Sequence, residues 1–341
     1  MATDIYVKAD TGSDGGEGTQ GSPYEHISFA LGRIANPLTD VTTIHLTSNG
    51  TAFTETNGIV SFRNIRLGAE GAKLIIQADD YVDSSWVLWN ENYYENGTNP
   101  YNGEVPLNIT TNRPASLEIR FEFIDCEGIE LRGLHFNPND DGEEMNIKAE
   151  GFNRDIVFKY CSFMCADMGL IISGPSMISF EMCYFMGNVY TLTALNGATV
   201  SLDGDNLFAN PILGAIRAID RASVSVNPWQ YGPTRYYTTT IQTSTVHKEE
   251  YHAILLQDAS SLRVPYDPMM PLDVYNGKVV IHHEGAKLPE NYYGVKLASK
   301  SLLSGADDFE FTMKNLKGET VEMPAEQQIM IGEGQDVTVV D

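Results

Sequence analysis

The chain has 341 residues, of which 42% are hydrophobic, and its 22 basic and 46 acidic side chains give a formal net charge of −24. It is long and apolar enough to bury a sizeable core. The charge excludes nucleic acid and acidic membrane surfaces as natural partners, because both attract cationic proteins. A polyanionic glycan would be repelled at long range unless a divalent cation bridged it, whereas a neutral glycan would not.

The N-terminal residues, 1–40, are predicted to form a cap. A short alternating strand is followed by five glycines between Gly12 and Gly21, which break the chain. Ser22 and Glu25 then have the spacing of a capping box, and Ile27 and Leu31 follow at helical spacing. We expect a short helix here that covers the open end of the fold.

The stretch 129–208 repeats itself. Four copies each contain a short alternating strand that ends in a phenylalanine, at steps of 27, 22 and 23 residues: Phe136, Phe163, Phe185 and Phe208. A period in the low twenties without helical spacing is typical of a parallel β-helix, whose coils stack at about 4.8 Å. The phenylalanines are then predicted to stack inside the core.

We therefore predict an all-β fold, a right-handed single-stranded parallel β-helix with a short N-terminal capping helix. Its body is expected over residues 41–265, with aromatic-rich insertions near 79–116 and 227–251 that break the repeat. From about residue 266 prolines interrupt the pattern. Residues 266–341 are predicted to cap the far end or to mediate oligomerisation.

The two insertions hold the candidates for ligand binding, which are Trp86, Trp89, Tyr93, Tyr94, Trp229 and Tyr231. The face of a sugar ring stacks on Trp or Tyr, and neighbouring polar residues can hydrogen-bond its hydroxyl groups. The same aromatic rings could instead pack against the wall of the β-helix or against a sister subunit.

Acidic residues around the repeats are the catalytic candidates. Asp203 and Asp205 share a face if their segment is extended, and they could act as an acid/base pair or hold Ca²⁺. The same Asp-Gly-Asp-Asn segment also has the composition of a turn. Asp220 beside Arg221 could place a cation next to a catalytic carboxylate, or could form an exposed ion pair.

The four cysteines are Cys126, Cys161, Cys165 and Cys183. Their spacing lacks the close pairs of a metal site, so we predict buried thiols. We expect no metal ligands and no cofactor, Ca²⁺ being the one ion that the acidic segments could attract.

Several short motifs near the N-terminus resemble the cap of pectate-lyase-like right-handed β-helix proteins, a superfamily that includes bacteriophage tail spikes and appendages. They are Tyr6-Val7, Gly12-Ser13-Asp14, Gly18-Thr19, Pro23, Ile27, Ala30-Leu31, Ile44-His45-Leu46 and Phe53-Thr54-Glu55. The resemblance extends over residues 1–265, and it implies a fold rather than a reaction. Enzymes of the superfamily carry aspartate pairs, or aspartate with arginine or lysine, on the outer face of their central coils.

The resemblance and the missing catalytic motifs predict a virion protein, namely a tail spike, fibre or decoration protein that attaches to a host-surface glycan without cleaving it. We expect a homotrimer in the virion, bound to other virion proteins, made in the host cytoplasm without a signal peptide and not inserted in a membrane. The alternative is a polysaccharide depolymerase of the same fold, either a glycoside hydrolase or a polysaccharide lyase. Asp203, Asp205 or Asp220 would then act as acid or base, and Arg221 would stabilise charge.

Overall fold

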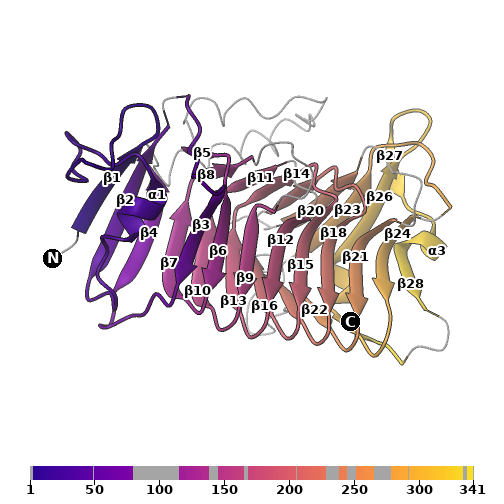
Figure 1. Cartoon of the computed structure of the whole chain (residues 1–341). Helices are drawn as coiled ribbons and strands as arrows, with labels where there is room; N and C mark the ends of the chain where they lie inside the picture. Colours follow the sequence, from indigo (N-terminus) through magenta and orange to yellow (C-terminus); the bar gives the residue numbers. More distant parts are fainter. Residues whose placement is uncertain are drawn as a thin grey trace, which may run out of the picture.

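The computed structural model describes residues 3–48, 50–79, 115–137, 145–164, 168–204, 206–227, 238–243, 251–264, 278–290, 292–332 and 336–340. These residues form a stack of coils whose strands assemble into three long sheets, with the N-terminus at one end of the stack (Figure 1). No helix in this part of the chain is long and apolar enough to cross a membrane.

Each of the three sheets runs the length of the stack. Sheet 1 contains β1 (Thr3–Lys8), β2 (Val41–Thr47), β4 (Lys73–Ala78), β7 (Glu127–Arg132), β10 (Arg154–Lys159), β13 (Met177–Glu181), β16 (Thr199–Asp203), β19 (Ser223–Asn227), β22 (Ser261–Arg263), β25 (Leu302–Ser304) and β29 (Thr338–Val340). Sheet 2 contains β5 (Ala115–Leu117), β8 (Leu134–Phe136), β11 (Ser162–Met164), β14 (Tyr184–Met186), β17 (Leu207–Ala209), β20 (Thr238–Thr243), β23 (Lys278–His283), β26 (Phe309–Lys314) and β27 (Thr320–Glu322). Sheet 3 contains β3 (Ile59–Arg63), β6 (Arg120–Ile124), β9 (Ile147–Glu150), β12 (Met168–Ser173), β15 (Tyr190–Leu195), β18 (Gly214–Ile219), β21 (Tyr251–Gln257), β24 (Tyr292–Leu297) and β28 (Ile329–Ile331). The described helices are α1 (Ile27–Leu31), α3 (Ala325–Gln328) and a 3₁₀ helix (Ala306–Asp308).

The order of the strands makes this a parallel β-helix, as predicted, and its parallel crossover connections take the usual right hand. From β7 to β26, successive strands join sheets 1, 2 and 3 in turn, so each strand pairs with the strand one coil earlier. The pairing is parallel, except between β26 and β27. The coils continue past residue 265 through β23 to β29, so residues 278–340 extend the same β-helix. The capping or oligomerisation role of residues 266–341 stays a prediction.

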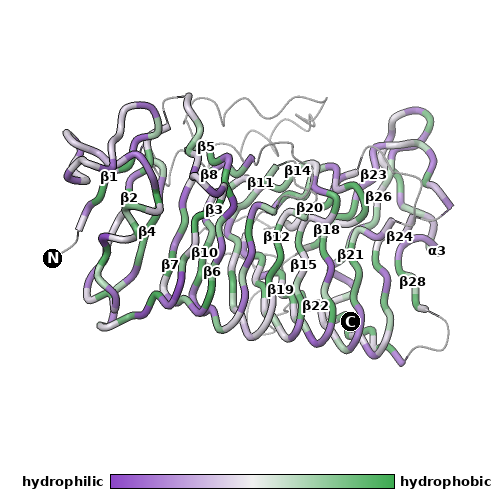
Figure 2. The backbone as a smooth tube through the Cα atoms, in the orientation of Figure 1, coloured by the Kyte–Doolittle hydropathy of each residue, from purple (hydrophilic) through white to green (hydrophobic). Residues whose placement is uncertain are grey.

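Alternation along each strand separates the core from the surface. In β10, Ile156 and Phe158 are fully buried, whereas Lys159 points outward. Figure 2 shows the same alternation of hydrophobic and hydrophilic residues along many strands. Because a strand has a side-chain period of two, each coil contributes one set of residues to the interior and one to the outer surface.

The predicted phenylalanine column is confirmed. Phe136, Phe163, Phe185 and Phe208 are fully buried and in register on neighbouring strands of sheet 2. Their ring centroids are 5.1, 5.1 and 4.4 Å apart, and neighbouring rings lie within 13° of parallel. This spacing is close to the distance between strands, so the aromatic stack follows directly from the pairing of the coils.

A residue in the left-handed region turns the chain from sheet 1 to sheet 2. Gly133, Tyr160, Met182 and Gly204 occupy this corner in consecutive coils, with φ between 51° and 71°. The glycine of the Asp-Gly-Asp-Asn segment is therefore a corner residue, and Asp203 is the last residue of β16 before it. Glycine adopts this conformation at no steric cost.

The cysteines of the described residues are buried thiols, as predicted. Cys126, Cys161 and Cys183 are not bonded to one another and are at most 1% exposed. Burial raises the pKa of the Cys183 thiol well above its usual value, because the thiolate would lose its hydration. Cys165 lies outside the described residues.

The N-terminal cap contains the predicted helix, but the predicted capping box is wrong. The residue before α1 is His26, and its side chain makes no capping hydrogen bond. Asp14 instead accepts hydrogen bonds from the backbone N–H groups of Glu25 and His26, at 3.2 and 3.1 Å. Ser22 and Glu25 are not free to form the box, because the segment around Tyr24 pairs with β1. That pairing also protects the edge of the first strand.

The predicted insertion at 227–251 contains a strand of the β-helix. β20 pairs with β17 and β23, and its Ile241 aligns with Phe208 and Ile281. The threonine-rich segment suits a strand because threonine is β-branched. The sequence repeat was obscured here because the coil is longer than its predecessors. Of the other insertion, residues 80–114 lie outside the described part of the chain.

The aromatic stack generates a prediction about stability. Phe180 is fully buried and stacks on Phe158 at 5.1 Å, so Phe180→Ala should lower the free energy of unfolding by about 3–5 kcal/mol. Phe152 is 48% exposed and serves as the control, since Phe152→Ala removes the same ring from the surface. Urea denaturation followed by circular dichroism measures both. Equal destabilisation by the two substitutions would contradict the assigned core.

Candidate functional site

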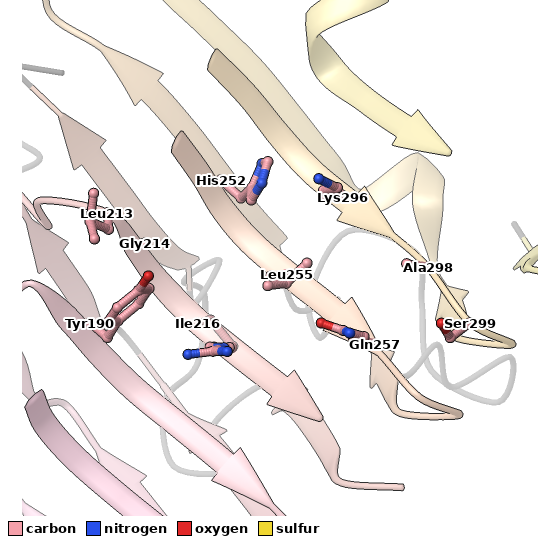
Figure 3. Close-up of a pocket in the computed structure, with 11 residues that line it drawn as sticks. Tyr190, Leu213, Gly214, Ile216, His252, Leu255, Gln257, Lys296, Ala298 and Ser299 are labelled. Carbon is pink, nitrogen blue, oxygen red and sulfur yellow. The ribbon is translucent and has the colours of Figure 1, made fainter. Parts of the chain in front are cut away.

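A groove lies on the outer face of sheet 3 and crosses β15, β18, β21 and β24 (Figure 3). Its volume is about 560 Å³. It is lined by Tyr190, Leu213, Gly214, Ile216, Arg217, His252, Leu255, Gln257, Lys296, Ala298 and Ser299.

The strand alternation explains why these side chains reach the groove. In β21, Ile254 and Leu256 are fully buried in the core, whereas Leu255 and Gln257 between and after them are only partly buried. Arg217 of β18 is the register partner of Leu255, and Lys296 of β24 is the partner on its other side. Three consecutive coils therefore place a cation, an apolar residue and a second cation in one outward column.

A glycine in the lining of the groove allows two neighbouring coils to approach closely. Gly214 is the register partner of Tyr190, and its own next neighbour is the backbone of His252. A side-chain carbon at Gly214 would approach the backbone oxygen of His252 to 2.8 Å, closer than such contacts normally come. The position therefore carries no side chain, because the backbone of the next coil fills the place that a side-chain carbon would take.

The groove combines cationic, aromatic and hydrogen-bonding side chains. The guanidinium carbon of Arg217 lies 5.1 Å from the centre of the Tyr190 ring, a cation–π contact. The ring of His252 lies 5.9 Å from that of Tyr293 on the neighbouring coil. Gln257 adds an amide and Ser299 a hydroxyl group. Such a surface can stack on an apolar face and hydrogen-bond polar groups around it.

A second polar surface lies on the outer face of sheet 1. One outward column runs through Arg132, Lys159, Glu181, Asp203 and Asn227 on five consecutive coils. Lys159 Nζ lies 3.0 Å from a carboxylate oxygen of Glu181, and Asp203 Oδ1 accepts a hydrogen bond of 2.8 Å from the amide of Asn227. The column is thus a chain of paired charges and hydrogen bonds.

Glu181 and Asp203 are two carboxyl groups on neighbouring coils of this column. Burial raises the pKa of Glu181; Lys159 opposes that shift, while the negative charges of Asp203 and Glu130 add to it. Asp203 also accepts a hydrogen bond of 2.6 Å from the hydroxyl group of Ser201. Two carboxyl groups in unlike environments are the arrangement from which acid/base pairs are built.

The sequence-predicted catalytic residues do not all come together. Asp203 is on the outer face of sheet 1, and Asp205 lies outside the described residues. Asp220 and Arg221 form the turn between sheets 3 and 1, both at positive φ, and make an ion pair of 3.3 Å with side chains 46% and 75% exposed. The N–H of Gly197, before β16, donates to Asp220 O. Asp220 therefore lies near the N-terminal ends of the strands of sheet 1, whereas Asp203 lies at the C-terminal end of β16. The two aspartates are at opposite edges of the sheet.

The sequence-predicted ligand-binding residues lie outside the described part of the chain. They are Trp86, Trp89, Tyr93, Tyr94, Trp229 and Tyr231. Their role stays a prediction.

Sequence reasoning missed both Glu181 and the residues of the groove. A usable signal existed for Glu181, because Lys159 and Glu181 each stand four places before a phenylalanine of the repeated column. Arg217 and Lys296 gave no such signal, since the coils that carry them contain long connections.

No metal centre is found among the described residues. None of them forms a group of three or more His, Cys, Asp or Glu side chains that could hold a metal ion.

The proximity of Glu181 and Asp203 can be measured directly. Asp203→Asn should lower the pKa of Glu181, because it removes one of the negative charges that disfavour ionisation of that carboxyl group. Carbon-13 NMR titration of the glutamate carboxyl groups measures the change, with the Glu181→Gln spectrum identifying the resonance. Asp220→Asn is the control, since Asp220 lies at the other edge of the sheet. An unchanged pKa in Asp203→Asn would show that the two groups do not interact.

The chain is similar to known proteins among solved structures. No protein-family model matches the chain, and no curated protein matches it. Two crystal structures of GH136 lacto-N-biosidase from Eubacterium ramulus are similar to it, the selenomethionine derivative with a TM-score of 0.37 at 10% identity and the native protein with 0.35 at 9%. Each comparison covers 99% of this chain and 68% of that one. Because these scores are low, the assignment as a β-helix rests on the strand order and register of the chain itself.

Proposed function

We propose that this chain is a carbohydrate-binding β-helix protein that holds an oligosaccharide in the groove on sheet 3. The observation that carries the proposal is the groove itself, which is lined by the stacked pair of Tyr190 and Arg217 and, on coils further along, by the amide of Gln257 and the hydroxyl group of Ser299. Its volume, about 560 Å³, is typical of sites for small organic ligands.

The groove offers the two kinds of contact that a sugar requires. The pyranose rings of an oligosaccharide have apolar C–H faces, which can pack on Tyr190 and, further along, on Leu255, and hydroxyl groups, which can bond to Gln257 and Ser299. The outward column repeats from coil to coil at about 4.8 Å, so a chain of sugars can lie along the β-helix and meet a new row of side chains at each coil. The open shape suits a polymer better than an enclosed small molecule.

Attachment to a host-surface glycan is the role that we propose for this groove. None of the described residues that line it is Asp or Glu, and the carboxyl pair of a hydrolase is therefore not provided there. The virion setting, the homotrimer and the other virion proteins as partners belong to the same proposal. They follow from the resemblance of the N-terminal motifs to tail-spike and appendage proteins.

A depolymerase is the second candidate, favoured by the carboxyl groups on sheet 1. Glu181 and Asp203 are register partners on neighbouring strands, whose backbones lie about 4.8 Å apart, so their carboxyl groups can approach each other across one coil. Retaining glycoside hydrolases hold their two carboxyl groups at about 5–5.5 Å. Glu181, with its raised pKa, would act as the acid, and Asp203 as the nucleophile. Asp205, Asp220 and Arg221, which the sequence predicts for this reaction, are the alternative to this pair.

Binding at the groove predicts a dependence on the aromatic ring. Tyr190→Ala should weaken the binding of a glycan identified on an oligosaccharide array by roughly three- to tenfold, because the stacking face is lost. Tyr190→Phe keeps that face and should bind nearly as well as the parent. Isothermal titration calorimetry measures all three affinities, and Phe152→Ala controls for the loss of an aromatic ring elsewhere. Unchanged affinity in Tyr190→Ala would exclude this groove as the glycan site.

Hydrolysis on sheet 1 predicts a different set of effects. If the chain releases reducing ends from a polysaccharide, Glu181→Gln and Asp203→Asn should each lower the rate about a hundredfold or more, since proton transfer or attack is removed. Asp220→Asn and Arg221→Gln should leave it unchanged, and melting temperatures verify that each variant folds. Loss of activity only in the Asp220 or Arg221 variants would move the site to the turn between sheets 3 and 1. Absence of cleavage across acidic and neutral polysaccharides would leave attachment as the function.

A further inference from the structure

The groove on sheet 3 is a cationic region of a strongly acidic chain. The full sequence has 46 acidic and 22 basic residues, yet Arg217 and Lys296 line the groove and none of its described lining residues is acidic. A local excess of positive charge inside a field of the opposite sign attracts an anionic group at short range. Neutral sugars do not require it.

Arg217 differs from other arginines of the described residues. Arg120, Arg132 and Arg154 each pair with a glutamate, at 2.8, 2.6 and 2.8 Å. The guanidinium group of Arg217 is held by the ring of Tyr190 instead, and within the described part of the chain its Nε, like that of Arg120, is buried without a hydrogen-bond partner. Arg33 also stacks on a ring, that of Phe29, but Arg217 is the stacked arginine that lines the groove. Stacking fixes the plane of a guanidinium group but leaves its N–H groups free to donate.

A carboxylate matches what the stacked guanidinium group lacks. Its two oxygens accept a pair of parallel hydrogen bonds from the planar fork of an arginine. Lys296 stands two coils along the same outward column, about 10 Å away by strand spacing, with the apolar side chain of Leu255 between the cations. A sugar ring can therefore rest on the floor of the groove while an acidic group at its edge reaches Arg217.

We propose that the groove selects a saccharide that carries a carboxylate, such as a uronic acid, and that Arg217 binds this carboxylate. The inference rests on the proposed function of the groove as a glycan site. It adds the class of sugar and the residue that distinguishes it. Lys296 contributes a second positive charge to the same strand of sugars.

The test compares acidic oligosaccharides with uncharged versions of the same chains. Hexasaccharides of galacturonate, mannuronate and hyaluronan are titrated into the full chain by calorimetry, each beside its carboxyl-reduced form and beside a sulfated neutral hexasaccharide. At least one uronate should bind, and its carboxyl-reduced form should bind about tenfold more weakly or worse. The affinity for the uronate should fall as salt is added.

Substitutions assign the effect to Arg217. Arg217→Gln should weaken binding of the uronate about ten- to hundredfold, leave the reduced form unaffected, and make the two forms bind alike. Arg217→Lys should recover only part of the affinity, because it keeps the charge without the fork. Arg263→Gln, on the outer face of sheet 1, is the matched control and should bind like the parent. Melting temperatures verify that the variants are folded.

The outcomes separate the inference from the function on which it rests. Equal affinity for the acidic and reduced forms, or an unchanged affinity in Arg217→Gln, overturns the carboxylate assignment and leaves the glycan site standing. Binding of the sulfated chain but of no uronate also overturns it. Failure of every saccharide, acidic or neutral, to bind the parent overturns the proposed function and the inference together.

Discussion

The stacking of each coil on the previous one in register is the constraint on which this structure depends. Neighbouring coils lie about 4.8 Å apart, so each residue of a strand stands beside its register partner on the next coil. Inside the β-helix this repetition produces the ladder from Phe136 to Phe208, whose ring spacing of 4.4 to 5.1 Å follows the strand spacing. On the outside it produces columns of polar residues. In such a fold the same coils that form the core also carry the outer side chains, so functional groups on the surface lie in columns along the stack.

The two outer surfaces use this repetition differently. On sheet 1 the column satisfies itself, because Lys159 pairs with Glu181 and Asn227 bonds to Asp203. Paired charges of this kind stabilise a register and are expected on the outer surface of any β-helix. On sheet 3 Arg217 is held by the ring of Tyr190, and it lines a groove together with Lys296. A stacked arginine at the wall of a groove is better suited to a ligand than to the fold alone.

The sequence predicted the parts of the fold that repeat at a short and regular period. Phe136, Phe163, Phe185 and Phe208 follow one another at 22 to 27 residues, and this regularity was sufficient to predict the β-helix and the core column. The capping box failed because hydrogen bonds from another part of the cap, Asp14, replaced it. Local spacing says nothing about a partner eleven residues away. The sequence did not predict β20 for a related reason. Its Ile241 follows Phe208 by 33 residues, which is longer than the regular steps of the phenylalanine column.

The long coils are also the reason why the sequence did not predict the groove on sheet 3. Arg217, Leu255 and Lys296 are neighbours in space but are separated by 38 and 41 residues in sequence, well beyond the period of the phenylalanine column. Asp203 was found because it lies within the regular stretch, although its partner Glu181 was not recognised. The net charge of −24 pointed toward neutral glycans, but total charge averages over the surface and carries no information about a single groove.

A crystal structure of the full chain bound to an acidic hexasaccharide tests the central claim most directly. We predict sugar density along the outer face of sheet 3, with one ring against Tyr190 and a carboxylate within hydrogen-bonding distance of the Arg217 guanidinium group. Density over Glu181 and Asp203 on sheet 1, with the groove on sheet 3 empty, would contradict it.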